Sequence, residues 1–227
     1  RLLYSSSACI YPDHLQTQVN NPGLVESDAY PAAPQGGYGL EKLFCERVCV
    51  AYAEQYGMAV RVARFHNIFG TLEPWRGGRE KAPAALCRKV AVAKLAPALA
   101  GKVEVWGDGA ATRSYCWIDD ALCGVVALMR SNFGQPLNIG SAESVSVDEL
   151  VAMIAQLAGA EVLVTHVPGP EGVRGRNSNN ELCRSVLGWA PTTQLREGLA
   201  KLYPWIEEQV RAALAAGTPP ADLAAGR

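Results

Sequence analysis

Residues 38–65 read YGLEKLFCERVCVAYAEQYGMAVRVARF, and this stretch decides the fold class. Its first part carries apolar residues at helical spacing, at Leu40, Leu43, Phe44, Val48 and Ala51. Gly57 follows and is a typical end for such a helix. The segment from Ala59 to Phe65 is apolar and rich in β-forming residues, which is typical of a buried parallel strand. The stretch therefore predicts a helix followed by a strand.

The residues before this stretch supply a second strand. Leu2 to Tyr4 form a short apolar run that ends in the serines Ser5, Ser6 and Ser7. A loop rich in proline and glycine then runs through residues 12–37. Strand, helix and strand in this order predict an α/β fold with a parallel sheet. Because the first residues already read as a strand in progress, we expect the chain to be a fragment of a longer protein.

Further elements are expected beyond residue 70. Ser146 and Glu149 form a capping box, which marks the start of a helix. The apolar spacing predicts helices at 83–93, 119–129, 146–157 and 195–216, and strands at 103–106, 115–118 and 162–167. Residues 218–227 are expected to be disordered.

Composition excludes several classes of protein. With 227 residues, of which 49% are hydrophobic, the chain can build one sizeable core or a core with a smaller lobe. A net charge of −1 does not suit a surface for nucleic acid. The most apolar stretch is broken by Lys94 and Pro97, so no membrane span is predicted. Seven cysteines without a Cys-x-x-Cys pair indicate neither a zinc ribbon nor a disulfide framework, and they favour the reducing cytoplasm.

Tyr38 and Lys42 form the first candidate site. Residues four apart share one face of a helix, so the Lys42 ammonium is expected beside the Tyr38 phenol. A free phenol has a pKa of about 10, too high for a base at neutral pH, and a neighbouring cation favours the phenolate. Alone the pair is a weak signal, because tyrosine and lysine often occur at this spacing by chance.

A serine-rich strand end stands upstream of this pair, in Ser5-Ser6-Ser7-Ala8-Cys9-Ile10-Tyr11. Ligands of open α/β sheets bind at the carboxyl ends of strands. A serine there, followed by a helix that opens with Tyr-x-x-x-Lys, resembles the Ser-Tyr-Lys set of the short-chain dehydrogenases. The resemblance implies hydride exchange between a carbinol and a nicotinamide. It implies Tyr38 as the base, helped by Lys42, with Ser7 near the same oxygen.

Further motifs resemble the extended, sugar-nucleotide members of that family. They are Arg64-Phe65-His66-Asn67-Ile68-Phe69-Gly70, Trp106-Gly107-Asp108-Gly109, Thr112-Arg113-Ser114, Ile118-Asp119-Asp120 and Leu137-Asn138-Ile139-Gly140. Arginine suits a diphosphate because its planar fork donates hydrogen bonds in pairs. The resemblance implies an α/β protein with the C-terminal part of a Rossmann-like parallel sheet and a smaller α/β substrate-binding lobe.

Longer strings resemble the GDP-mannose 3,5-epimerase family within that group. They cover residues 7–12, 77–84 and 168–178, and the resemblance extends to about Gln209. It implies conversion of GDP-D-mannose to GDP-L-galactose by inversion at C3 and C5, through transient oxidation of C4 by bound NAD. Cys9 and Lys81 stand at the positions of the acid–base pair that exchanges protons with the two carbons.

The same resemblance implies which residues contact the ligands. Tyr38 and Lys42 would contact the NAD cofactor. The nucleotide sugar would be contacted by Ser7, Ala8, Cys9, Asn67, Glu80, Lys81, Ala82, Lys89, Ala111, Thr112, Arg113 and Arg176, with no metal ion. The chain departs from the family in three places, at Ala111 in place of a glutamine, in a longer segment over 92–102, and at Pro204.

The expected domains follow from the same comparison. Residues 1–70 would be the second half of an NAD-binding Rossmann domain, and residues 71–217 mainly the nucleotide-sugar lobe, with some segments returning to the Rossmann domain. A phosphate-binding glycine loop of either the Gly-x-Gly-x-x-Gly or the Gly-x-x-Gly-x-x-Gly type is not expected in this chain. Residues 1–227 alone would then bind NAD poorly and be inactive. By analogy within the fold, the Tyr38 helix implies a homodimer.

Two alternatives stay open. The first is a sibling enzyme, such as a 4-epimerase, a decarboxylase or a 4,6-dehydratase. The dehydratases carry an Asp-Glu pair where this chain has Ala8 and Cys9, and a 4-epimerase leaves Cys9 and Lys81 without a role. The second is a non-catalytic sensor, which would be expected to have lost Tyr38 or Lys42, whereas this chain has both.

Overall fold

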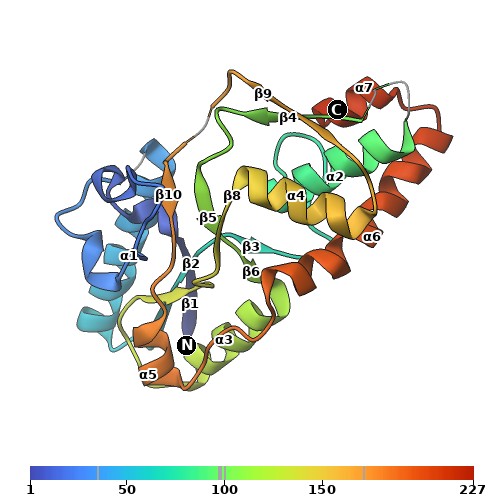
Figure 1. Ribbon diagram of the computed structural model, residues 1–227. Coiled ribbons are helices and arrows are strands. Elements are labelled where there is room, and N and C mark those ends of the chain that lie inside the picture. Colours follow the sequence, from blue (N-terminus) through green and yellow to red (C-terminus); the bar gives the residue numbers. More distant parts are fainter. Residues whose placement is uncertain (35, 97–98, 100, 171) are drawn as a thin grey trace. The chain divides into compact units, whose positions relative to one another are not determined.

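The computed structural model describes residues 1–34, 36–96, 99, 101–170 and 172–227 (Figure 1). The chain forms two compact units, each built from segments that alternate along the sequence. Unit 1 comprises Arg1–Ile68, Thr112–Ser144 and Val173–Thr193, and unit 2 comprises Phe69–Ala111, Val145–Gly172 and Gln194–Arg227. Pro97 and Glu171 lie outside the described residues. Among the helices that are described, none is long and apolar enough to cross a membrane.

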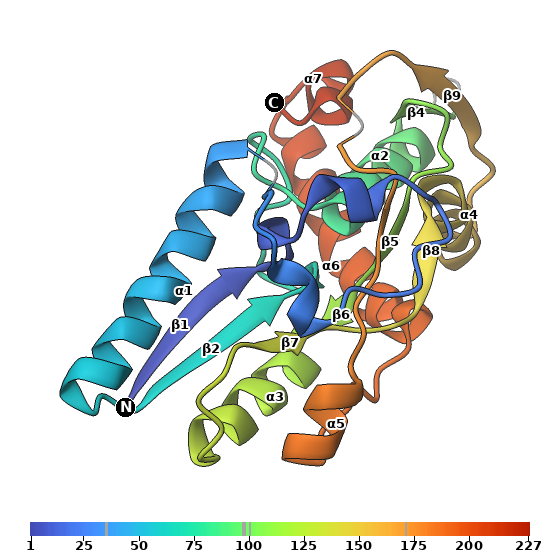
Figure 2. The ribbon, with the colours of Figure 1, turned by 90° about the vertical axis from the view of Figure 1, so that its left-hand side faces the viewer.

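A parallel sheet forms the centre of unit 1. Its strands β1 (Leu2–Ser7), β2 (Val60–Phe65) and β7 (Leu137–Ile139) lie side by side in that order, as Figure 2 shows. β1 and β2 run parallel, with Leu2 opposite Val60 and Ser7 opposite Phe65. The helix α1 (Gly36–Tyr56) connects them. The predicted strand–helix–strand unit and the α/β class are therefore confirmed.

Helices cover both faces of this sheet. Val60 and Val62 of β2 pack with Cys49 of α1, whereas Ala63 packs in a cluster with Leu128 of α3 (Ile118–Arg130). Because successive residues of a strand point to opposite faces, β2 is buried on both sides. This double burial explains why residues 59–65 read as a mostly apolar run. The helix α5 (Glu181–Leu187) packs beside β7.

Short elements complete unit 1. The loop between β1 and α1 contains the 3-10 turns η1 (Ala8–Ile10), η2 (Asp13–Gln16) and η3 (Glu26–Ala29). The strand β10 (Gly175–Arg176) pairs in parallel with β5 (Thr112–Ser114). β3 (Ile68–Phe69) and β8 (Ser144–Ser146) lie at the boundaries of the units. The strand predicted over 115–118 has the wrong bounds, because β6 covers Cys116–Trp117 and α3 begins at Ile118.

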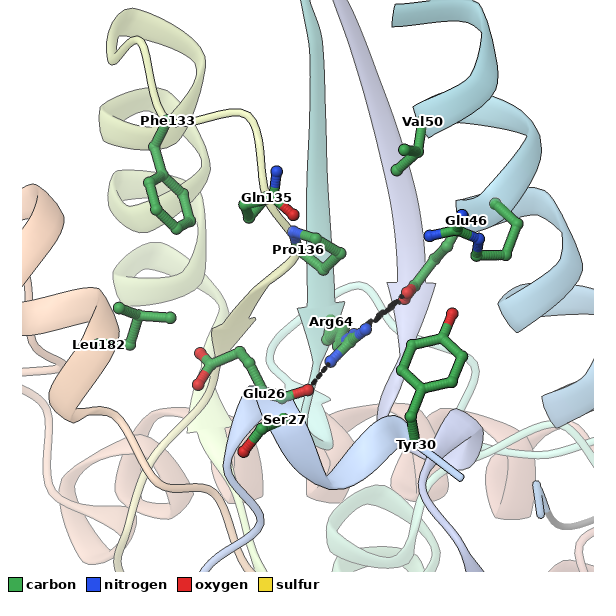
Figure 3. Close-up of a pocket in the computed structure, with 11 residues that line it drawn as sticks. Glu26, Ser27, Tyr30, Glu46, Val50, Arg64, Phe133, Gln135, Pro136 and Leu182 are labelled. Carbon is green, nitrogen blue, oxygen red and sulfur yellow. Dashed lines mark hydrogen bonds and ion pairs between the residues drawn. The ribbon is translucent and has the colours of Figure 1, made fainter. Parts of the chain in front are cut away.

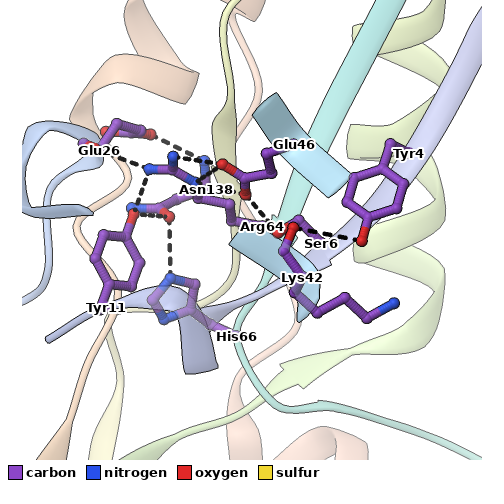
Figure 4. A network of polar contacts seen from close by, with 9 residues as sticks. All are labelled: Tyr4, Ser6, Tyr11, Glu26, Lys42, Glu46, Arg64, His66 and Asn138. Carbon is purple, nitrogen blue, oxygen red and sulfur yellow. Dashed lines mark hydrogen bonds and ion pairs between the residues drawn. The ribbon is translucent and has the colours of Figure 1, made fainter. Parts of the chain in front are cut away.

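A buried ion pair ties α1 to β2 (Figure 4). Both side chains are almost inaccessible to solvent, and Arg64 Nη2 lies 2.7 Å from Glu46 Oε2. Arg64 Nε also donates to Glu46 Oε1 at 3.0 Å, so the contact is bidentate. The Ser6 hydroxyl donates to Glu46 Oε1, and Arg64 Nη1 donates to the Glu26 carbonyl at 2.8 Å. Burial lowers the pKa of Arg64, but the hydrogen bonds and the charge of Glu46 outweigh it and raise the pKa.

The helix α1 meets the turn η1 at Gly39. A Cβ atom at this position would lie 2.2 Å from the Cys9 carbonyl oxygen and 3.0 Å from the Cys9 carbonyl carbon. Both are backbone atoms and cannot rotate away, so the close approach depends on glycine. The contact fixes the first turn of α1, which carries Tyr38, against the turn that carries Cys9.

Unit 2 is built around the helix α2 (Ala82–Leu95). It packs against α4 (Val147–Ala158), α6 (Leu195–Ala215) and α7 (Pro220–Ala225), while β4 (Lys102–Trp106) and β9 (Leu163–Val167) pair in parallel. The predicted capping box is confirmed, because Ser146 Oγ accepts from Glu149 N and Glu149 Oε2 accepts from Ser146 N. These hydrogen bonds lower the pKa of Glu149. Pro204 lies inside α6.

The prediction of a disordered tail at 218–227 is wrong. Residues Pro220–Ala225 form α7, and Leu223 is fully buried. The reason lies in α2, where the buried Arg88 guanidinium donates to the Leu223 carbonyl and, at 2.8 Å, to the Ala224 carbonyl. Both carbonyls lie in the last turn of α7, where helix carbonyls run out of intrahelical partners, and the Leu223 carbonyl also accepts from Gly226 N at 3.0 Å. The carbonyl groups at the end of α7 and the buried Arg88 guanidinium thus provide each other with hydrogen-bond partners.

We expect Gly39→Ala to destabilise unit 1. The added methyl group would push the Cys9 backbone away from α1, and overpacking of this kind costs about 1–3 kcal/mol of the free energy of unfolding. Gly37→Ala is the matched control, because a Cβ there meets nothing within 4 Å and alanine in a helix gains about 0.5–1 kcal/mol over glycine. Urea denaturation of both variants measures the difference, and equal effects would contradict the close-contact argument.

We expect Glu46→Leu to cost about 3–5 kcal/mol, because it leaves the Arg64 guanidinium buried without its carboxylate. The double variant Glu46→Leu with Arg64→Met should recover much of that loss, since both charges are then removed. Arg211→Met removes the exposed partner of Glu207 in α6 and should cost less than about 1 kcal/mol. Denaturant titration of the four proteins would contradict the prediction if the double variant were as unstable as Glu46→Leu.

Candidate functional site

The first turns of α1 bring Tyr38 and Lys42 together. The Tyr38 side chain is 55% exposed, and Lys42 Nζ lies 5.6 Å from the centre of its ring. Lys42 Nζ also donates a hydrogen bond to the Ser5 carbonyl at 3.1 Å. Because Ser5 belongs to β1, this bond holds the ammonium at the carboxyl end of the strand. That is the end at which ligands bind in sheets of this kind.

Ser7 and Cys9 lie at the same strand end. β1 ends at Ser7, whose hydroxyl accepts a hydrogen bond from the Cys9 backbone N–H at 3.2 Å. Ala8, between them, is buried with Ile10 in a small apolar cluster. The Gly39 contact with the Cys9 carbonyl brings α1 to this turn. Within unit 1, the structure therefore gathers the predicted residues of the first strand and of α1 around one strand end.

Two arginines come to unit 1 from paired strands. Arg113 of β5 and Arg176 of β10 stand opposite each other in the parallel register. Arg176 Nη1 donates to Cys9 Sγ at 3.3 Å, and Arg113 Nη2 donates to the Val173 carbonyl at 2.6 Å. Burial lowers the pKa of Arg113, and the charge of Arg176 adds to the effect. A concentration of positive charge therefore lies close to the Cys9 sulfur.

Asn67 and Thr112 are held by backbone carbonyl groups. Asn67 has a positive φ of 44°, and its side-chain amide donates to the Ser114 carbonyl at 2.9 Å. The Thr112 hydroxyl donates to the Val19 carbonyl. Both side chains thus help to fix β5, the strand that carries Arg113.

A polar network beneath this strand end contains residues that sequence analysis did not assign to a site (Figure 4). Asn138 Oδ1 accepts from the Tyr11 hydroxyl at 2.6 Å and from His66 Nε2 at 3.0 Å. Burial lowers the pKa of His66 to about 3, so the ring is neutral. Because the Asn138 amide nitrogen donates to the Leu24 carbonyl, its Oδ1 faces His66 as an acceptor, which assigns the ring proton to Nε2. Arg64 also reaches the Tyr11 hydroxyl, at 3.3 Å. The sequence carried only a weak signal for this network. Glu46, the partner of Arg64, looks in the sequence like any charged residue on a helix.

The remaining predicted residues belong to unit 2. Lys81 is exposed and occupies the N-cap position of α2 without a side-chain capping hydrogen bond, and Ala82 follows it. Glu80 Oε1 accepts from Arg88 Nη2 at 2.9 Å, and Lys89 Nζ donates to the Glu104 carbonyl at 2.7 Å.

Burial distinguishes three positions of unit 2. Burial lowers the pKa of Lys89, while Ala111 is buried at the end of its segment. Burial raises the pKa of Glu73 to about 7, although a hydrogen bond from Gly70 and the charge of Lys81 oppose the rise. This carboxyl group near Lys81 was not predicted from the sequence. The pairing of Lys81 with Cys9 of unit 1 stays a prediction.

A glycine pattern follows β9. Gly169, Gly172 and Gly175 have the Gly-x-x-Gly-x-x-Gly spacing, contrary to the expectation that no such spacing occurs. The segment leads into the strand β10 and not into a helix. It therefore lacks the helix N-terminus that binds a dinucleotide phosphate.

A cavity of about 300 Å³ lies elsewhere in unit 1 (Figure 3). Glu46 and Arg64 form part of its wall, and Tyr30 and Leu182 line it as well. Burial raises the pKa of Glu26, another lining residue. Among the described residues that line this cavity, none was predicted to contact substrate or cofactor. The cavity is thus separate from the predicted site.

Comparison with known proteins agrees with this geometry. The chain is 49% identical over 218 residues to GDP-mannose 3,5-epimerase of Arabidopsis thaliana. The aligned residues make up 96% of this chain and 56% of that protein. The UDP-glucose 4-epimerase of Thermotoga maritima has the same fold, with a TM-score of 0.79 and 21% identity over 92% of this chain and 63% of that one.

A second solved structure is UDP-glucuronic acid 4-epimerase of Bacillus cereus with UDP-glucuronic acid and NAD. Its TM-score is 0.73 at 21% identity, over 91% of this chain and 61% of that one. The chain spans about half the length of the curated relatives it matches. The model of the NAD dependent epimerase/dehydratase family matches residues 1–140. The Rossmann-like sheet, the Tyr38 helix and this match agree, and the chain belongs to the NAD dependent epimerase/dehydratase family.

Proposed function

We propose that this chain carries the acid–base half of an isomerase that converts GDP-D-mannose to GDP-L-galactose by inverting C3 and C5. The observation that carries the proposal is the position of Cys9, at the end of β1 with Arg176 on its sulfur and α1 against its backbone. An enzyme that only oxidises and reduces C4 has no use for a thiol there. The 49% identity to a GDP-mannose 3,5-epimerase supports the same substrate.

We further propose NAD as the cofactor. The exposed Tyr38 phenol and the Lys42 ammonium, held by the Ser5 carbonyl, form a donor set that fits a sugar hydroxyl beside a nicotinamide ribose. When bound, NAD would supply reversible hydride transfer at C4 of the sugar. Tyr38, as a phenolate that the charge of Lys42 stabilises, takes the proton of the C4 hydroxyl and becomes a phenol.

The inversions use a second set of groups. A ketone at C4 acidifies the hydrogens on C3 and C5, so a base can remove a proton from one face while an acid returns one to the other. Cys9 and Lys81 serve as this pair, and their proton inventory balances because each inversion removes one proton and adds one. The nucleotide sugar is held by the predicted contacts Ser7, Ala8, Asn67, Glu80, Ala82, Lys89, Ala111, Thr112, Arg113 and Arg176.

We also propose that the protein is a homodimer that works in the cytoplasm. Four large side chains on α1 are highly exposed, namely Leu40 at 59%, Phe44 at 66%, Tyr52 at 50% and Tyr56 at 72%. Their spacing in multiples of four residues places them in one oblique stripe that winds around the helix. Such a stripe supports a self-complementary helix contact between two copies. The free cysteines support a reducing compartment.

The substrate proposal predicts solvent exchange at two carbons. The full-length protein, in place of residues 1–227 alone, incubated with GDP-mannose and NAD in deuterium oxide should incorporate deuterium at C3 and C5 but not at C4, as nuclear magnetic resonance of the product would show. Tyr38→Phe should abolish all exchange with the fold intact, because oxidation at C4 precedes it. Cys9→Ser should lose exchange by about 100-fold or more while C4 oxidation persists. Exchange at neither carbon would favour a 4-epimerase, and turnover by Tyr38→Phe would rule out the tyrosine base.

The dimer proposal predicts that Phe44→Glu dissociates the protein. A charge in the centre of the stripe would be buried without a partner in the dimer, which costs several kcal/mol. Leu163→Glu, at a similarly exposed apolar position of β9, should leave the assembly unchanged. Analytical ultracentrifugation measures both, and a monomeric wild-type protein would refute the proposal.

A further inference from the structure

Gln16 is a buried polar residue that joins several parts of unit 1. It lies at the end of η2 and is 1% exposed. Its side-chain nitrogen donates to the carbonyl groups of Tyr11, at 3.1 Å, and Pro12, at 3.2 Å. Its side-chain oxygen accepts from Arg176 Nε at 2.5 Å. The amide is thus bonded on both sides.

These partners allow one orientation of the amide. The two partners of the nitrogen are carbonyl oxygens, which only accept, and the partner of the oxygen is a guanidinium, which only donates. Turning the Gln16 amide by half a rotation would place an acceptor against two acceptors and a donor against a cation. The Gln16 oxygen therefore always faces Arg176.

The other end of the guanidinium reaches Cys9. Arg176 is itself buried, and its Nη1 donates to Cys9 Sγ at 3.3 Å. A guanidinium is planar and rigid, so an acceptor that holds Nε also sets the direction in which Nη1 donates. Gln16 thereby controls a contact with a sulfur atom that it does not touch.

The backbone of β10 rests on the same segment. Arg174 N donates to the Gln16 carbonyl at 3.0 Å. A Cβ at Gly175 would lie 2.0 Å from the Gln18 carbonyl oxygen, so the strand lies directly against residues 16–19. Both the main chain and the side chain of Arg176 are therefore placed by the segment that begins with Gln16.

We propose that Gln16 is a positioning residue of the epimerase site, which holds the Arg176 guanidinium against the Cys9 sulfur and so stabilises Cys9 as a thiolate. The inference rests on the proposed role of Cys9 as a member of the acid–base pair. A hydrogen bond from a charged donor favours the anionic form of a sulfur, and the thiolate is the form that takes a proton or reacts with an alkylating agent. Without Gln16, the guanidinium can turn toward other acceptors.

The test is the alkylation rate of Cys9 in Gln16→Met. Methionine has a similar length but cannot accept from Arg176 Nε in the same way. Iodoacetamide is added at one fixed pH, and peptide mass spectrometry follows Cys9 against the exposed Cys123 in the same sample. Loss of a hydrogen bond to a charged group predicts a roughly tenfold slower reaction of Cys9. Gln18→Met makes the same change at an exposed neighbouring glutamine and should leave the rate unchanged.

Two further measurements separate positioning from a loss of structure. Arg176→Met should slow Cys9 alkylation at least as much without altering η2, and adding Gln16→Met to it should have no further effect on the rate. Thermal denaturation of each variant reports its folding. An unchanged Cys9 rate in a folded Gln16→Met, or additive effects in the double variant, would overturn the inference.

Exchange experiments with substrate distinguish this inference from the proposed function. Gln16→Met should lose solvent deuterium exchange by about the same factor as alkylation, whereas oxidation at C4 should persist. If the wild-type protein exchanges no hydrogen with solvent at C3 or C5, the proposed function fails while the alkylation result still tests the Gln16 contact. If the wild type exchanges and Gln16→Met exchanges equally fast, the positioning role fails alone.

Discussion

The bidentate contact between Glu46 and Arg64 is the interaction on which the rest of unit 1 depends. Two charges removed from water cost more than their mutual attraction returns unless every remaining donor and acceptor is satisfied. The pair meets that condition with Ser6 of β1 and the Glu26 carbonyl of η3. Segments far apart in the sequence are thus held at fixed positions by one requirement, the solvation of a buried guanidinium and a buried carboxylate.

The same requirement reaches the candidate site through Tyr11. Its hydroxyl lies between Arg64 and Asn138, and its carbonyl accepts from Gln16. Cys9 stands two residues before it, in the turn that Gly39 contacts. The sulfur is therefore placed from two directions, by polar contacts from the core and by the close approach of α1. Neither requires a bound ligand, so the strand end is organised in advance of one.

Patterns within a few residues of sequence were enough to predict those elements and contacts that are local in the chain. The spacing of Leu40, Leu43 and Phe44 indicated α1, and a distance of four residues was enough to place Lys42 beside Tyr38. The partners of Gln16 and Glu46 could not be predicted in this way, because Arg176 and Arg64 come from distant segments. The helix α7 was not predicted for the same reason, because its last carbonyls accept hydrogen bonds from Arg88 of the distant helix α2.

The distinction between local and long-range contacts also applies to the two reactions of the proposed site, hydride transfer at C4 and proton exchange at C3 and C5. Tyr38 and Lys42 lie on adjacent turns of one helix, so any sequence that keeps the helix and these two residues keeps the pair side by side. Cys9 depends instead on Gln16 and Arg176, which only the folded loop and β10 bring together. A substitution at residues 11–19 can therefore alter proton exchange at carbon without affecting oxidation of the alcohol. On the proposed mechanism, a change of reaction within this fold is more readily made in that loop than in α1.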